Sequence, residues 1–462
     1  MYLDIFKVQT TIIWVKFMKK LGLFSLAWPI FVETALFMLL GFVDVFVLSR
    51  YDDLAASSVN TANQAVSIVT IVFTVISGAS AVLISQYLGA NKRENASRIA
   101  AISMVFNLVA GIVISVALAL FSKEILVFIG AKDTILDFAS EYLSIVGGFL
   151  FLQAVLASMS VIVRNHGLTQ ISMYVTVGMN IMNTVLDVVL VLGLFGAPKM
   201  GVMGVAVATT FSRIIGTIVL AIVLFKKIES VKIFKLLKPF PWIDVKNIFK
   251  IGVPSALESF LYNLSQLVIT SMVLYYLTNE ELIARTYVQN ITMIFYIFAV
   301  AIGQASQIIT GHLVGAGEMD EAYRRGVRAY KFSLLITLSA CTVGVILRKP
   351  LMDIFTDDKN VILLGAGILL IDWFLELGRT TNIVVIACLR GAGDVYFPTI
   401  CAIFSMWLVS VLGAYIFAVV LDMGIFGLWV ALALDEILRG VLMVWRFKSG
   451  KWRTKAVVKT QE

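Results

Sequence analysis

The chain has 462 residues, of which 60% are hydrophobic and only 14% are charged, and its mean hydropathy is +0.95. Soluble globular proteins carry about 25% charged residues, so this composition excludes an ordinary water-soluble domain. Seven prolines and 32 glycines exclude a proline- and glycine-rich disordered chain. The formal net charge of +8 has to be explained by where the basic residues fall.

Long continuous apolar segments fill most of the chain. A helix needs about 20 such residues to cross a bilayer, and continuous runs favour helices over the alternating strands of a barrel. Twelve segments meet this length, and they are separated by short polar loops. They are 24–49, 59–87, 99–121, 138–162, 170–196, 200–225, 251–277, 285–313, 330–347, 361–388, 396–420 and 424–446.

Three short motifs recur at an offset of 225 or 226 residues. The pairs are Leu88-Gly89-Ala90 with Val314-Gly315-Ala316, Arg164-Asn165-His166-Gly167 with Arg390-Gly391-Ala392-Gly393, and Pro29 and Glu33 with Pro254 and Glu258. This period is too long for a solenoid and indicates two homologous halves. Because each half has six segments, both halves share one orientation, as in transporters built from parallel repeats. We therefore predict an all-α integral membrane protein with twelve transmembrane helices in two pseudo-symmetric six-helix lobes.

The predicted organisation has five parts. They are a cytoplasmic or interfacial N-terminal segment (1–23), a first lobe (24–225), a cytoplasmic linker (226–250), a second lobe (251–446) and a cytoplasmic tail (447–462). The linker carries seven lysines, which we expect to lie on anionic lipid headgroups. Residues 1–17 are apolar but lack a small-residue cleavage site, so they fit an interfacial helix, or an extension upstream of a start at Met18, better than a signal peptide.

The basic residues are distributed unequally between the two sides. Of 37 lysines and arginines, 26 fall in the termini, linker and loops of one side and eight in the loops of the other. The excess predicts that both termini are cytoplasmic and that the chain lies in the plasma membrane, the inner membrane of a bacterium. It also explains the net charge without a nucleic-acid partner. We expect a monomer that lies in the lipid bilayer.

Motifs for enzymatic chemistry are missing from the sequence. It contains no phosphate-binding loop, dinucleotide fingerprint, nucleophile elbow or histidine cluster, and its three cysteines lack zinc-site spacing. We therefore expect no enzyme activity, no cofactor and no structural metal.

Ionisable residues inside the predicted spans are few, and each is a functional candidate because burying a charge in lipid is unfavourable. In the first half, Asp44 and Asp187 fall at similar depth in the outer half of the membrane. Asn180 and Asn183 share a helix face with Asp187, and Thr209 enters from the sixth segment, with Thr210 beside it. Such a set of oxygens can hold a proton or a small hard cation. In the alternative interpretation, Asp44 lies near an interface and Asp187 pairs with Arg213.

The second half has a different set of buried charges. Glu376, Arg379 and Asn382 form one helical stripe, and Asp435, Glu436 and Arg439 form another. These residues can form a structural ion-pair network or a second transport site, and both interpretations stay open. Glu33 behind Pro29 and Glu258 behind Pro254 are candidates for gates or for headgroup contacts, and Pro29 and Gly41 are candidate flexible points of the first span.

The chain resembles the multidrug and toxic compound extrusion family, within the wider group of flippase-like exporters. The resemblance covers Leu21 to Trp452. Its carriers are Phe42-Val43-Asp44, Gln86-Tyr87-Leu88-Gly89-Ala90, Asn183-Thr184-Val185-Leu186-Asp187, Gly201-Val202-Met203-Gly204 with Ala208-Thr209, Gly252-Val253-Pro254, Leu389-Arg390-Gly391-Ala392-Gly393-Asp394 and Asp435-Glu436.

This resemblance implies twelve helices around an inverted-V cavity and export of organic molecules coupled to entry of H⁺ or Na⁺. It assigns a first-lobe cation site to Asp44, Asn183, Asp187 and Thr209, with Na⁺ possible at the first three. Some members also use a tenth-span aspartate, where this chain has Arg379. That difference argues against a second-lobe site of the same kind, although Glu258, Glu376, Asp435 and Glu436 remain candidates.

The predicted function is a cation-coupled antiporter that exports organic, cationic or amphiphilic compounds by alternating access of the two lobes. A flippase for a lipid-linked intermediate is the alternative. It would favour a cavity rich in arginine and lysine, whereas Arg213, Arg379 and Arg439 all have acidic neighbours.

Overall fold

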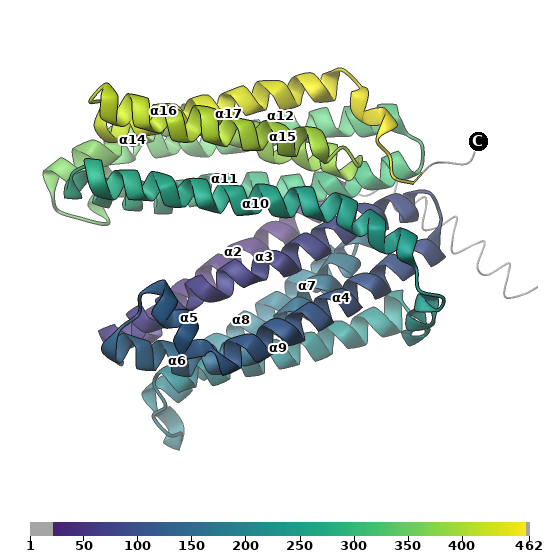
Figure 1. The fold of residues 1–462 in the computed structure, drawn as a ribbon, viewed down its shortest axis with the longest axis horizontal. Coiled ribbons are helices and arrows are strands. Elements are labelled where there is room, and N and C mark those ends of the chain that lie inside the picture. The colour runs from purple at the N-terminus through teal and green to yellow at the C-terminus, as the bar shows by residue number, and fades with distance from the viewer. Residues whose placement is uncertain (1–21, 459–462) are drawn as a thin grey trace, which may run out of the picture. The chain divides into compact units, whose positions relative to one another are not determined.

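The computed structural model describes residues 22–458, except for the side chains of Phe42 and Asp53. The predicted interfacial segment 1–17 and the last four residues of the tail lie outside the described range. Within that range every regular element is a helix (Figure 1). Ten of the described helices are long and apolar enough to cross a membrane, or eleven if one bent pair counts as a single span.

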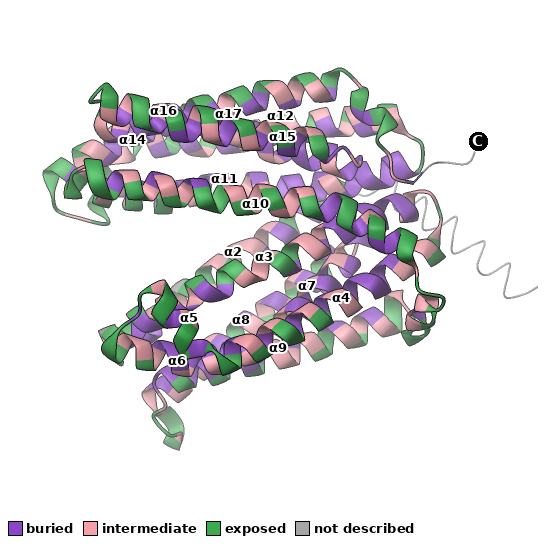
Figure 2. Ribbon diagram, viewed as in Figure 1, coloured by how far each residue is buried: buried purple, intermediate pink, exposed green. Residues whose placement is uncertain are grey.

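Internal contacts divide the chain into two compact units. One contains Trp28–Leu88 and Lys92–Gly252, and the other contains the chain from Val253 onward together with Gly89–Asn91. In each unit, the buried residues lie on the helix faces that pack against other helices of that unit (Figure 2).

The first half follows the predicted order of spans. Its helices are α2 (Leu23–Ser49), α3 (Asp53–Gly89), α4 (Arg93–Leu120), α5 (Ser122–Ile129), α6 (Asp133–Gly148), α7 (Phe151–Asn165), α8 (Thr169–Leu192) and α9 (Val202–Val223), and the short turns η1 (Leu194–Gly196), η2 (Leu224–Ile228) and η3 (Val231–Leu237) complete it. Helix α9 corresponds to the predicted sixth segment, 200–225, and its two ends lie within three residues of the predicted bounds. The linker, predicted at 226–250, is partly helical.

The fourth predicted span, 138–162, is broken rather than continuous. Helices α6 and α7 meet at an angle of 47°. At Gly147 an added Cβ would lie 2.8 Å from Leu118 Cβ, so the absence of a side chain lets α6 approach α4 closely. The backbone N–H of Phe151, freed by the break, donates to Ser115 Oγ at 2.9 Å. A side chain of α4 thus replaces the missing helical acceptor.

The sequence repeats correspond to repeated turns. After α7, Gly167 has a φ of +77°, and after α14 (Lys359–Gly391), Gly393 has a φ of +91°. The next residue in each turn bonds back to the helix, with Leu168 N–H donating to Val163 O and Asp394 N–H donating to Leu389 O. Glycine suits both positions because other L-residues rarely adopt a left-handed conformation.

The second half also follows the predicted order. Its helices are α10 (Trp242–Tyr276), α11 (Asn279–Gly315), α12 (Met319–Ile346), α13 (Arg348–Asp353), α14, α15 (Tyr396–Ser405), α16 (Leu412–Ala414) and α17 (Gly424–Lys448), with turns η4 (Met406–Val411), η5 (Tyr415–Val420) and η6 (Lys451–Thr454). Helix α10 begins nine residues before the predicted 251, just after Pro241, a residue that favours the start of a helix. Two π-helical turns, η4 and η5, interrupt the predicted span 396–420.

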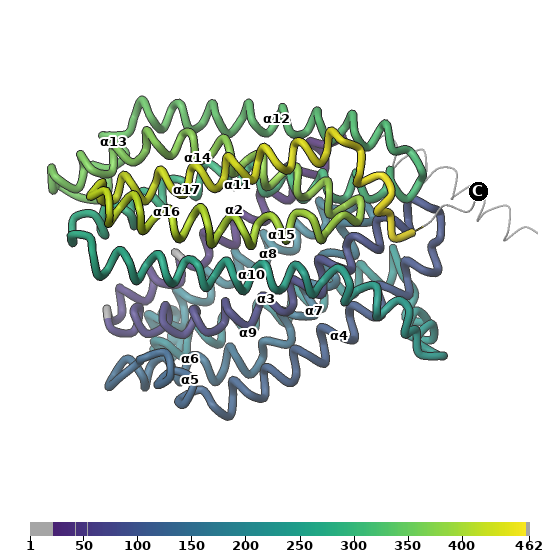
Figure 3. The backbone as a smooth tube through the Cα atoms, turned by 45° about the horizontal axis from the view of Figure 1, so that its top comes forward, coloured from purple at the N-terminus to yellow at the C-terminus, as the bar shows by residue number. Residues whose placement is uncertain are grey.

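Close helix packing at glycines holds the second unit together. Helix α14 packs against α11, α12 and α17, which run beside it (Figure 3). A Cβ on Gly378 of α14 would lie 2.5 Å from the backbone carbon of Glu436 in α17, and one on Gly391 would lie 2.6 Å from Gln307 O in α11. Small residues at such contacts let membrane helices approach closely. Helix α17 carries three charged residues in its middle, Asp435, Glu436 and Arg439, and it is the predicted twelfth span.

Candidate functional site

The first lobe brings together the two aspartates that the sequence singled out. Asp44 lies on α2 and Asp187 on α8, and their exposed fractions are 5% and 0%. Asp187 belongs to a helix face of α8 that is buried along its whole length, with Asn180 and Asn183 on the same face. Thr209 approaches from α9 and is also buried. The predicted first-lobe set is therefore assembled within one helix cluster.

Asn183 connects the two carboxyl groups. With its amide nitrogen turned toward them, Asn183 donates to Asp44 Oδ1 at 3.2 Å and to Asp187 Oδ2 at 3.1 Å, and its carbonyl oxygen accepts from the Thr209 N–H at 3.2 Å. The opposite orientation leaves only a 3.3 Å contact to Thr209 Oγ1. We adopt the first orientation because it satisfies both ends of the amide.

Two carboxylates that bind the same amide nitrogen lie close enough to repel each other, unless a cation or proton lies between them. Asp187 Oδ1 is buried and has no hydrogen-bond partner, so the pair has an unused acceptor. An electrostatic interaction links Asp44 with Arg213, but none of the ion pairs within 4.0 Å in the described chain joins Arg213 to Asp187. Asp44 is buried rather than extended toward an interface. The burial of Asp44 and the lack of an Arg213–Asp187 ion pair in the described chain thus argue against the alternative of a snorkelling Asp44 and a paired Asp187.

Asn180 and Thr210 take a less direct part. Asn180 Nδ2 donates to the carbonyl oxygen of Thr176, one turn earlier on α8, at 2.8 Å. The hydroxyl of Thr210 is buried without a partner. Neither residue bonds directly to the aspartates. In the described chain, no group of three or more histidine, cysteine, aspartate or glutamate side chains could hold a metal. The first-lobe site therefore offers the oxygens of two carboxylates, which suit a proton or Na⁺, while the Asn183 N–H groups hold these carboxylates together.

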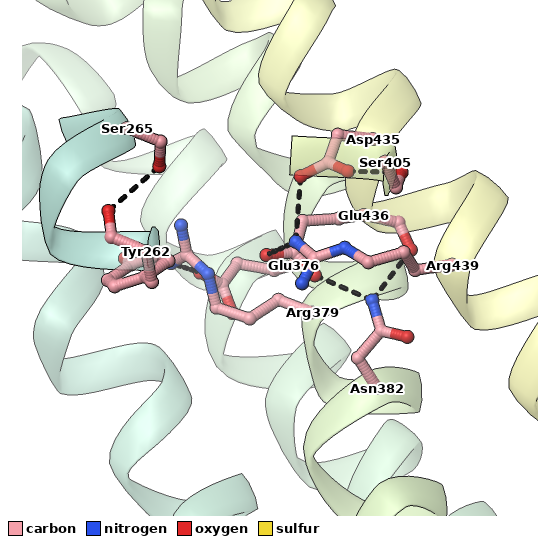
Figure 4. A network of polar contacts seen from close by, with 9 residues as sticks. All are labelled: Tyr262, Ser265, Glu376, Arg379, Asn382, Ser405, Asp435, Glu436 and Arg439. Atoms are coloured by element: carbon pink, nitrogen blue, oxygen red, sulfur yellow. Dashed lines mark hydrogen bonds and ion pairs between the residues drawn. The ribbon is translucent and has the colours of Figure 1, made fainter. Parts of the chain in front are cut away.

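Four of the five second-lobe candidates, Glu376, Arg379, Asp435 and Glu436, lie in one group of polar contacts, and Glu258 is not part of it (Figure 4). Glu376 pairs with Arg379, and Asn382 donates to the side chain of Glu436 at 2.6 Å and to its backbone carbonyl at 2.8 Å. Arg439 bridges Asp435 at 2.7 Å and Glu436 at 2.8 Å. Unlike the first-lobe aspartates, each of these three acids has an arginine partner.

Two further hydrogen bonds hold buried aspartates of this lobe. Ser405 donates to Asp435, and Trp429 Nε1 donates to Asp372 Oδ1 at 3.1 Å. No sequence pattern pointed to Ser405, whereas Tyr262, also near the network in Figure 4, falls one helical turn after Glu258. Arg379 also lies over the ring of Tyr296, 5.2 Å from its centroid.

Glu33 and Glu258 occupy equivalent positions in the two lobes, and each joins three helices. Glu33 of α2 accepts from Ser172 of α8 at 3.1 Å and lies 3.7 Å from Arg164 at the end of α7. Glu258 of α10 accepts from Arg390 at 2.7 Å and from Thr399 of α15 at 2.8 Å. We call each set a glutamate clasp.

Each clasp brings together two of the repeated motifs. The glutamate that follows the proline in one motif pairs with the arginine of the other motif. The partners of Glu258 are therefore Arg390 and Thr399 rather than members of the network around Glu376. Glu33 is buried and paired with protein groups, so it is not simply a headgroup contact. Pro29 and Pro254 lie inside α2 and α10, one turn before their glutamates. At Gly41 an added Cβ would meet nothing within 4 Å.

Comparison with known proteins gives the family. Residues 29–189 and 254–416 match the MatE family. The chain is 34% identical to the uncharacterized transporter YisQ of Bacillus subtilis, over 95% of this chain and 96% of the relative. It is 29% identical to a probable multidrug resistance protein NorM of Thermotoga maritima, over 94% of both chains.

Solved structures support the same fold. A crystal structure of MATE in the bent conformation has a TM-score of 0.86 at 19% identity, and the match covers 94% of this chain and 98% of that one. Such structures have twelve helices in two lobes, which confirms the predicted fold class. The predicted resemblance is also confirmed. The chain is a multi-pass membrane protein and belongs to the MatE, or multidrug and toxic compound extrusion, family of transporters rather than to an enzyme family.

Proposed function

We propose that this transporter is an antiporter that exports organic, cationic or amphiphilic compounds in exchange for entry of H⁺ or Na⁺. The observation that carries the proposal is the pair of buried carboxylates, Asp44 and Asp187, bridged by the amide of Asn183. A cation bound there removes the repulsion between the two acids. Its loss restores that repulsion, so binding and release can favour different packings of α2, α8 and α9.

The substrate class is supported by the relatives. Several of them, including proteins of Thermotoga maritima and Halalkalibacterium halodurans, are named probable multidrug resistance protein NorM. A single cation moving down a potential of about 100 mV supplies ~2.3 kcal/mol, which sustains a substrate gradient of roughly 50-fold. Coupling to one ion is therefore sufficient for useful export.

We further propose that the chain works as a monomer in the plasma membrane with both termini cytoplasmic. The excess of lysine and arginine on one side of the predicted topology supports this orientation. In this orientation Glu33 and the start of α8 lie toward the cytoplasm, and the Asp44–Asp187 pair lies in the outer half of the membrane.

The experiment is transport of ethidium in proteoliposomes with a pH gradient or a Na⁺ gradient imposed separately. The proposal predicts that at least one gradient drives ethidium against its own gradient. Coupling is reciprocal, so an ethidium gradient should also move that ion in the opposite direction. Ethidium transport that is indifferent to both gradients would contradict the antiporter. Translocation of a headgroup-labelled lipid by the same vesicles would favour the flippase.

A further inference from the structure

Helix α8 has more buried polar residues than the acid pair requires. Its buried face contains Thr169, Ser172, Thr176, Asn180, Asn183 and Asp187, which follow one another at steps of three or four residues. Ser172 lies 15 positions before Asp187, which corresponds to about 22 Å along the helix. Polar residues are unfavourable in a membrane helix unless they have partners or a function. This polar face therefore extends well beyond the acids.

The polar face leads from the acid pair to the first glutamate clasp. Ser172 is the hydroxyl that donates to Glu33 Oε1 at 3.1 Å. Glu33 is 5% exposed, and its other oxygen, Oε2, has no hydrogen-bond partner although it lies 3.7 Å from Arg164 Nη1. A carboxylate with one unused oxygen thus lies at the opposite end of the face from Asp187.

The second lobe lacks this combination. Both partners of Glu258 bind the same oxygen, Oε2, at 2.7 and 2.8 Å, which makes its clasp tighter. At the repeat positions of Thr176 and Asn180, the second lobe has the buried residues Ala402 and Met406, although Ser405 and Ser410 nearby are also buried. The unbroken row of polar side chains along α8 is therefore not repeated there.

We propose that Glu33 is a second cation-binding carboxylate, which receives the coupling cation from Asp44 and Asp187 along the polar face of α8 and releases it to the cytoplasm. This inference rests on the proposed coupling role of the acid pair. The cation leaves the two aspartates, is passed between the amide and hydroxyl oxygens of α8, and binds Glu33. On release, Glu33 returns to its carboxylate form beside Arg164.

The geometry of the first clasp suits brief occupancy. Oxygen ligands along a path can replace the water around an ion, and conduction requires binding that is weak enough for the ion to leave. The positive charge of Arg164 lies close enough to compete with the cation for Glu33. Competition of this kind shortens the time that the cation stays, while Ser172 holds the carboxyl group at the end of the polar face.

The test separates two transport modes in proteoliposomes that contain the full chain. Exchange of radiolabelled ethidium for unlabelled ethidium needs no net movement of the coupling ion, whereas gradient-driven transport does. We expect Glu33→Gln to reduce gradient-driven transport at least tenfold and to leave exchange within about twofold of wild type. Glu33→Asp should restore much of the driven transport because it restores a carboxylate.

A second variant keeps the test decisive if Glu33→Gln fails to fold. Thr176→Val nearly preserves volume and lies midway along the polar face, away from the clasp, and we expect the same selective loss of driven transport by several-fold. Glu258→Gln serves as the matched comparison, and its ratio of driven transport to exchange should stay that of wild type.

The outcomes distinguish this inference from the proposed function. Wild-type driven transport in Glu33→Gln, or equal loss of both modes in Glu33→Gln and Thr176→Val, would overturn the role of Glu33 as an ion carrier. Wild-type protein that exchanges ethidium but shows no gradient-driven transport would overturn the antiporter itself, and the role of Glu33 with it.

Discussion

In the first lobe, Asp44 and Asp187 share one amide and have no ion-paired arginine, whereas in the second lobe Asp435 and Glu436 both bind Arg439. The two lobes descend from one repeat and keep the same turns and the same glutamate clasp. They differ in how they neutralise buried acids. The acids of the second lobe form ion pairs with arginines, whereas Asp44 has only an electrostatic interaction with Arg213 and Asp187 has no ion pair in the described chain. We therefore expect a cation to act on the first lobe, while ion pairs stabilise the second.

Removal of Arg439 should have the largest effect on stability. Arg439→Leu leaves the buried Asp435 and the half-buried Glu436 without this counter-charge, and breaking a buried pair costs about 3–5 kcal/mol. Equilibrium unfolding in mixed micelles measures this loss. Arg325→Leu is the control in the same lobe, since it breaks a more exposed pair with Glu321 and should cost less than about 1 kcal/mol. Equal losses in both variants would contradict the structural role of the network.

A buried histidine in the turn after α7 gives the stability of the first lobe a pH dependence. His166 occupies the repeat position of Ala392 in the turn after α7, and burial lowers its pKa from 6.5 to about 4. The unfolded chain therefore binds a proton that the folded chain does not between these two pH values. Stability is full above pH 6.5 and falls by up to about 3 kcal/mol as the pH decreases to 4.

The variant His166→Ala should flatten this dependence. Unfolding of wild type and variant at a series of pH values from 7.5 to 4 measures the difference in slope. If both proteins lose stability in parallel over this range, His166 is not the titrating group.

The smallest loss of stability is expected from a change at the break between α6 and α7, in the fourth span of the first lobe. Its counterpart α14 runs unbroken for 33 residues, whereas the break between α6 and α7 depends on the bond from Phe151 N–H to Ser115 Oγ. Ser115→Ala removes this acceptor and should cost about 1 kcal/mol. Ser144→Ala is the control because its hydroxyl bonds only within α6, to Glu141 O. Hydrogen exchange at Phe151 that is unchanged in Ser115→Ala would contradict this account of the break.

Much of the fold and of the first-lobe site could be predicted from the sequence. Helical periodicity predicted that Asn183 and Asp187 share one helix face. The similar membrane depth of Asp44 and Asp187 predicted that Asp44 lies near them. The repeat offset correctly paired the turns that contain Gly167 and Gly393. These features depend on local spacing and length, which a single sequence records.

Other features depend on contacts between helices, which spacing does not encode. The break between α6 and α7 lies beside the close approach of α6 to α4 at Gly147, and the donation of Ser405 to Asp435 joins two separate spans. Glu33 and Arg164 were each visible in the repeat, but nothing in their spacing shows that they meet. The predicted span begins after the start of helix α10 because residues 242–250 include Asp244, Lys246 and Lys250, which interrupt the apolar run.

The most direct test compares one acid from each lobe under an imposed cation gradient. Asp187→Asn and Asp372→Asn are both isosteric changes of buried aspartates, but Asp372 is bonded to Trp429 and lies in the lobe whose acids form ion pairs with Arg379 and Arg439. We predict that Asp187→Asn loses gradient-driven ethidium transport by at least about 30-fold and that Asp372→Asn stays within about threefold of wild type. Driven transport that survives in Asp187→Asn but is lost in Asp372→Asn would contradict it.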